Sequence, residues 1–124
     1  MREVEISENL TKFIFNKSQF SPAKKRVKYP VFMPPPNRRL SVFRISDLSE
    51  HKVWEIGNEV GALRELSVLA RADVTVSSVR ESGLDIDADC NPPRHANIIG
   101  WPENPSAIKL RAIELADAAD LVIK

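Results

Sequence analysis

The sequence has few of the residues that several common classes of site require. Of its 124 residues, one is cysteine, Cys90, and four are glycine. A single cysteine excludes an intramolecular disulfide and a multi-cysteine metal cage, and four scattered glycines cannot form a nucleotide-binding loop. The alternate acids Asp85, Asp87 and Asp89 lack the glycine and glutamate of a calcium loop. We therefore expect no metal and no cofactor, and an inert Cys90, because Asp89 beside it disfavours the thiolate.

Long hydrophobic runs are also missing. The apolar stretches are only a few residues long, whereas a membrane span needs about 20. The amino terminus does not show the charged and then apolar pattern of a signal peptide. With 43% hydrophobic and 28% charged residues, the composition is that of an ordinary globular domain. We expect one cytoplasmic domain over residues 1–124 that does not contact a membrane, with residues 1–9 as a candidate flexible segment.

Acidic residues are absent from one part of the chain. Residues 11–46, the basic segment, contain no Asp or Glu and nine Lys or Arg, so the segment carries +9 and the remainder −8. The segment also holds six of the eight aromatic residues. Its basic residues are Lys12, Lys17, Lys24, Lys25, Arg26, Lys28, Arg38, Arg39 and Arg44. The net charge of +1 therefore conceals a strong asymmetry along the chain.

Two interpretations of the basic segment remain open. In the first, its cations attract a polyanion and an exposed aromatic ring stacks on a base. In the second, the aromatic residues face the core and the cations pair with carboxylates of the same domain.

Periodicity and capping residues predict the order of elements. Alternating patterns indicate strands at residues 10–15, 27–33, 40–45, 68–74 and 95–101, with a shorter one near 84–88. The prolines at 34–36 suggest a hairpin between the second and third strands, and residues 17–28 resemble a loop. Ser49, Thr75 and Asn104 are candidate N-caps for helices over about 50–62, about 76–82 and from 105. Gly57, inside the first of these helices, indicates that another element approaches closely.

Strands that pair locally and helices at irregular spacing favour an α+β fold. We expect a mostly antiparallel sheet with two longer helices and one short helix packed on it. The two longer helices are expected on the same face.

One short stretch has residues suited to catalysis. His95 and Asn97 occupy alternate positions of a strand that follows a double proline. A histidine there can exchange protons near neutral pH, and an amide can orient a substrate. If Arg44, Arg71 and Arg94 converge on His95, the protein is a small enzyme for a phosphorylated or carboxylated molecule. Whether they converge depends on a strand order that the sequence does not reveal.

The favoured function is a small non-catalytic binding module for a nucleic acid or an acidic protein. Besides the enzyme, a third alternative is a structural or regulatory subunit, with Trp54 and Trp101 as interface anchors and self-association among the options. Whether the protein is an enzyme stays open. The candidate anion-binding residues are Lys24, Lys25, Arg26, Lys28, Arg38, Arg39, Arg44, Arg71 and Arg94.

Overall fold

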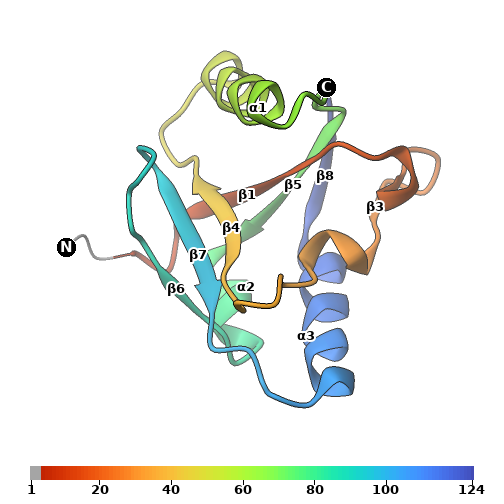
Figure 1. Cartoon of the computed structure of the whole chain (residues 1–124), viewed down its shortest axis with the longest axis vertical. Helices are drawn as coiled ribbons and strands as arrows, with labels where there is room; N and C mark the ends of the chain where they lie inside the picture. Colours follow the sequence, from red (N-terminus) through yellow and green to blue (C-terminus); the bar gives the residue numbers. More distant parts are fainter. Residues whose placement is uncertain (1–3) are drawn as a thin grey trace.

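The computed structural model describes residues 4–124 and confirms an α+β fold (Figure 1). In chain order, the elements are β1 (Asn9–Ile14), the helical turn η1 (Lys17–Gln19), β2 (Phe20–Ser21), β3 (Arg26–Val27), the helical turn η2 (Tyr29–Phe32), β4 (Leu40–Arg44), α1 (Glu50–Arg64), β5 (Ala70–Thr75), α2 (Val76–Glu81), β6 (Asp85–Asp87), β7 (His95–Ile99), α3 (Pro105–Ala118) and β8 (Asp120–Ile123). Strands β2 and β3 form a small separate hairpin.

The remaining six strands form one sheet in the order β6-β7-β4-β1-β5-β8, and every neighbouring pair is antiparallel. Strand β4 pairs with β1 and β7, so the predicted hairpin between residues 27–33 and 40–45 is wrong. Residues 29–32 instead form η2, with Pro30 in its first turn. Proline has no N–H to donate to a strand, and its fixed φ suits the start of a helical turn.

The helices begin where the capping residues predict. Ser49 Oγ accepts a hydrogen bond from Lys52 N at 3.2 Å. Thr75 Oγ1 accepts from Ser78 N, and the Asn104 side chain accepts at the start of α3. Each short polar side chain satisfies an N–H that has no partner within its helix.

The two longer helices lie on opposite faces of the sheet (Figure 1), so the expectation of a shared face is wrong. Leu10 of β1 belongs to the larger core cluster together with Leu115 of α3. Phe13 of β1 faces the other way and packs with Val53 of α1 in a second cluster. Successive residues of a strand point to opposite faces. Because β1 has large apolar residues on both of its faces, each face must pack against another element.

Gly57 explains how closely α1 approaches the sheet. A Cβ atom at this position would lie 2.7 Å from Phe13 Cε1, closer than two carbon atoms can pack. The predicted close approach is therefore confirmed, and it places the carboxyl half of α1 over β1.

The carboxyl-terminal segment adds the edge strand β8 to the sheet, and the amino-terminal segment is hydrogen-bonded to the start of α2. Strand β8, which the sequence did not predict, pairs with β5 directly after α3 ends. Near the amino terminus, the carbonyl oxygens of Ile6 and Glu8 accept hydrogen bonds from the backbone of α2. Residues 1–3 of the candidate flexible segment lie outside the described residues. Within residues 4–124, none of the helices has both the length and the hydrophobicity that a bilayer span requires.

Candidate anion-binding site

The central strand β1 pairs very differently along its two edges. Against β5 it forms six consecutive residue pairs, from Asn9 opposite Thr75 to Ile14 opposite Ala70. Against β4 it forms only two, Leu10 with Arg44 and Thr11 with Phe43. Beyond Thr11 the two strands separate, and the sheet opens between them. A pocket of about 390 Å³ lies at this opening, with η2 on one side and the end of α1 on the other.

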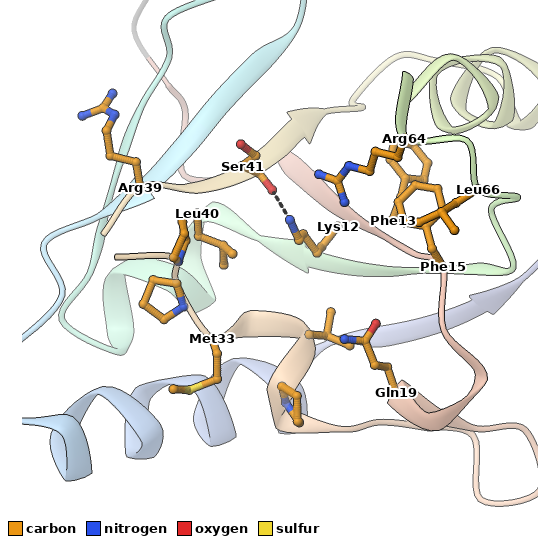
Figure 2. Close-up of a pocket in the computed structure, with 14 residues that line it drawn as sticks. Lys12, Phe13, Phe15, Gln19, Met33, Arg39, Leu40, Ser41, Arg64 and Leu66 are labelled. Carbon is orange, nitrogen blue, oxygen red and sulfur yellow. Dashed lines mark hydrogen bonds between the residues drawn. The ribbon is translucent and has the colours of Figure 1, made fainter. Parts of the chain in front are cut away.

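Lys12 lies where β1 and β4 separate. Its ammonium group donates a hydrogen bond to the backbone oxygen of Ser41 at 3.1 Å, across the gap (Figure 2). The side chain is only partly exposed. Burial lowers the pKa of Lys12 to about 8, and the positive charge of Arg64 contributes further. Both effects disfavour the charged amine, and no carboxylate among residues 4–124 lies within ion-pair distance of it.

Arg64, the last residue of α1, brings a second cation to the same pocket. Its guanidinium carbon lies 5.3 Å from the centre of the Phe15 ring. Figure 2 shows the side chain directed from α1 toward Lys12 and Ser41. The helix that packs on Phe13 therefore ends at the opening of the sheet.

The walls of this pocket, called the Lys12–Arg64 pocket below, combine apolar and polar side chains. Phe15, Val31, Met33 and Leu66 are among the residues that line it, and Gln19 adds a neutral amide. None of the described lining residues is Asp or Glu. Arg39 also reaches the pocket, but its guanidinium pairs with Asp87 and points away from Lys12 in Figure 2.

This arrangement is suited to an anionic group. An ammonium and a guanidinium together can hold a phosphate or a carboxylate through charge-assisted hydrogen bonds. The volume falls in the range of small-ligand pockets.

The remaining cations of the basic segment divide into paired and unpaired side chains. Among residues 4–124, six of the nine have no carboxylate within ion-pair distance. The Arg26 pair is more than half exposed on both sides, so it contributes little stability. The three pairs are Arg26 with Asp117, Arg39 with Asp87 and Arg44 with Glu8. Internal neutralisation is therefore real but covers only part of the segment.

The lysines predicted to contact phosphates lie on and beside the β2–β3 hairpin. Lys24, Lys25 and Lys28 are all exposed. Lys24, Arg26 and Lys28 line a second hollow, of about 470 Å³, beside Tyr29. Pro30 borders both this hollow and the Lys12–Arg64 pocket. The two groups of cations thus lie on either side of η2.

Other predicted anion-binding arginines contact groups of the same chain. Arg44 makes a two-point hydrogen bond to Glu8, with both distances at 2.8 Å. The hydrogen bond from Arg44 lowers the pKa of Glu8. Arg38 lies 3.5 Å from the backbone oxygen of Glu103, and Arg94 donates to the backbone oxygens of Arg44 and Ser46.

Arg71 is the most deeply buried of these arginines, at 4% exposure. Two of its nitrogens bind Glu50 at 2.7 and 2.9 Å, and the third binds Asp73 at 3.0 Å. Its guanidinium also lies over the ring of Trp54. Burial alone would lower the pKa of Arg71, but the hydrogen bonds to Glu50 and Asp73 outweigh it and raise the pKa.

His95 is held by a polar cluster of its own. Its Nδ1 lies 2.7 Å from Asp89 Oδ1, and Asn97 donates to the other oxygen of Asp89 at 3.1 Å. Desolvation raises the pKa of Asp89, but the hydrogen bonds from His95 and its other donors outweigh this and lower it. The ring packs edge-on against Phe43.

The predicted convergence on His95 is not what these contacts show. Arg44 and Arg94 line one pocket, of about 810 Å³, together with Glu8. Arg71 binds Glu50 and Asp73 instead, and the ring nitrogen of His95 binds Asp89. As for the candidate interface anchors, Trp101 is buried within the core of this chain, and Trp54 contacts Arg71.

Sequence reasoning singled out neither Lys12 nor Arg64 as a site residue. A signal for Lys12 was present, because it shares a strand face with Leu10 and Ile14, which are both fully buried. A lysine between two core positions must either find a partner or open onto a pocket. Arg64 carried no such signal, since its position depends on where α1 packs.

No protein-family model, curated protein or solved structure matches this chain.

Proposed function

We propose that this protein is a small binding module for single-stranded nucleic acid, with one phosphate held in the Lys12–Arg64 pocket. The observation that carries the proposal is the meeting of these two cations in a pocket without a carboxylate among its described lining residues. The phosphate would supply the counter-charge that residues 4–124 do not place in this pocket.

The hairpin lysines favour a polyanion over an isolated phosphate. Lys24 and Lys28 lie across η2 from the pocket and have no carboxylate partner among residues 4–124. A chain of linked phosphates can contact both groups of cations, and each contact releases counterions. Lys109, whose ammonium lies 5.0 Å from the centre of the Tyr29 ring, adds a further cation beside the second hollow.

The depth of Lys12 favours a single strand over a duplex. Its side chain is recessed between β1 and β4, with Ser41 and Phe13 beside it. A flexible strand can turn a phosphate into such a pocket, whereas the phosphates of a duplex stay fixed on a wide cylinder. The binding module is also favoured over the enzyme alternative, because Arg71 binds Glu50 and Asp73 while the His95 ring binds Asp89.

Fluorescence anisotropy with a labelled oligonucleotide tests the proposal. We expect binding of the single strand at low salt, with an affinity that falls steeply as salt rises. Lys12→Gln and Arg64→Gln should each weaken binding about tenfold, the loss of one phosphate contact. Lys12→Arg should bind like the wild type because it keeps the charge.

Lys52→Gln is the matched control, since Lys52 is an exposed lysine on α1 that pairs with Glu55. It should leave the affinity unchanged. The absence of binding at low salt, or equal affinity in Lys12→Gln and Lys52→Gln, would contradict the proposal. Binding of polyglutamate without binding of the oligonucleotide would contradict it too, and would indicate an acidic protein partner.

A further inference from the structure

The amine of Lys12 has an environment that nucleic-acid binding does not require. Its one hydrogen bond goes to the neutral carbonyl oxygen of Ser41. No carboxylate among residues 4–124 lies within ion-pair distance of it. The amine therefore lies beside an open pocket with no charged partner that would hold it protonated.

We propose that Lys12 is a reactive amine that forms an imine with small carbonyl compounds bearing a carboxylate or phosphate, with Arg64 holding the anionic group. This inference does not rest on nucleic-acid binding, although both use the Lys12–Arg64 pocket. It assigns to the pocket a covalent chemistry and a class of small ligand, namely anionic aldehydes and 2-oxo acids.

The charges around the amine favour its neutral form, which is the nucleophile. From α1, Arg64 repels the ammonium, and from β1 and β4 the neighbours are the neutral side chains of Phe13 and Ser41. Arg39, the remaining charged residue of the lining, is neutralised by Asp87. With a pKa of about 8, about a quarter of Lys12 is unprotonated at about pH 7.5, against about a thousandth of an ordinary lysine.

The reaction needs no redox partner. The nitrogen lone pair attacks the carbonyl carbon, a C–N bond forms, and the carbonyl oxygen takes up a proton to become a hydroxyl group. That hydroxyl group takes up a second proton and leaves as water, and the nitrogen loses the two protons it carried as a neutral amine. The two protons gained by the oxygen balance the two lost by the nitrogen, and a C=N bond remains. Arg64 neutralises the ligand's anionic group and fixes its distance from Lys12, while the apolar side chains of Phe15, Met33 and Leu66 contact the rest of the ligand.

Reductive trapping of the full chain with glyoxylate and cyanoborohydride tests the inference. Cyanoborohydride transfers a hydride to the imine carbon, so each imine becomes a stable carboxymethyl-lysine that peptide mass mapping locates. We expect Lys12 to be modified at least about tenfold faster than the exposed Lys52, and the pH profile of its rate to have a midpoint near 8. Modification of Lys12 no faster than Lys52, or a midpoint above about pH 10, would overturn the inference.

Two further arms test the role of Arg64 and separate the two proposals. Replacing glyoxylate by propanal, which lacks a carboxylate, should reduce the preference for Lys12 severalfold, and Arg64→Gln should abolish that difference between the aldehydes. An unchanged preference with propanal would overturn the role of Arg64.

Lys12→Arg should lose the adduct but keep its affinity for the oligonucleotide. Trapping of Lys12 without oligonucleotide binding would support this inference and contradict the proposed function. Oligonucleotide binding without trapping would support the proposed function and overturn this inference.

Discussion

The two edges of β1 differ in how far the described chain satisfies their polar and charged groups. Along the β1–β5 edge the ladder is complete, and the charges above it are matched: Thr11 and Arg71 both bind Asp73, and Arg71 also binds Glu50. Along the β1–β4 edge the ladder stops after two pairs, and Lys12 meets Arg64 without a carboxylate. The closed edge satisfies its polar groups internally, whereas at the open edge Lys12 and Arg64 have no carboxylate partner among residues 4–124.

The largest expected effect comes from removing the core anchor of η2. Phe32 is fully buried, and η2 forms one wall of the open edge. Phe32→Ala should lower the free energy of unfolding by about 3–5 kcal/mol, because it removes a large apolar side chain and leaves a cavity. Chemical denaturation measures this loss. An effect below about 1 kcal/mol would show that η2 does not depend on the core.

Removing a charge at the closed edge should cost more stability than removing a charge from an exposed ion pair. Arg71→Met should cost about 2 kcal/mol, because Asp73, whose side chain is 19% exposed, loses a buried partner. Glu50 is largely exposed and returns to water at little cost. Chemical denaturation of Arg71→Met and of Glu50→Gln compares their free energies of unfolding. Equal stabilities of the two variants would mean that the burial of Arg71 contributes nothing.

The open edge should respond in the opposite direction. The pKa of Lys12 is lowered from 10.5 to about 8 in the folded protein, so between these values the unfolded chain binds more protons and stability rises with pH. Below about pH 8 the cost of the buried charge is fully present. Lys12→Met should therefore stabilise the protein at neutral pH by about 1–2 kcal/mol and remove the rise above pH 8.

The control for that prediction is Lys52→Met, on the exposed surface of α1, which should leave both stability and its pH dependence unchanged. Thermal unfolding between pH 7 and about pH 10 compares the two variants. Destabilisation by Lys12→Met would show that the charge of Lys12 is compensated in the fold, and the contrast between the two edges would disappear.

The smallest expected effect lies where β1 and β4 are still paired, at Glu8 and Arg44. The hydrogen bond from Arg44 lowers the pKa of Glu8 below its usual 4.5, so the pair contributes stability above that pH and loses it as the pH falls through the folded-state value. Glu8→Gln should cost about 1 kcal/mol at neutral pH and reduce the acid sensitivity of unfolding. If Glu8→Gln lost stability at low pH as steeply as the wild type, Glu8 would have no lowered pKa in the folded protein.

Local signals predicted the parts of the fold that depend on local chemistry. The caps at Ser49, Thr75 and Asn104 act within a few residues of themselves, so the helix starts were correct. The apolar composition of residues 27–33 predicts a strand, but Pro30 suits a helical turn, and this turn packs on α3. The strand β8 is too short to give a periodic signal.

The site itself depends on distant contacts. The split between β1 and β4 follows from the strand order, and Arg64 reaches it only because α1 crosses β1 at Gly57. The sequence identified the charge asymmetry that includes Lys12 but not which of its nine cations would lack a carboxylate. That outcome is set by tertiary positions, as the pairing of Arg44 with Glu8 and of Arg39 with Asp87 shows.

The most direct test of the account is an NMR titration of the Lys12 side chain in carbon-13-labelled protein, with the signal assigned by its loss in Lys12→Arg. The account predicts a midpoint near pH 8 in the free protein and a higher midpoint when the single-stranded oligonucleotide is added, because a bound phosphate stabilises the ammonium form. A midpoint near 10.5 that the oligonucleotide does not move would contradict it.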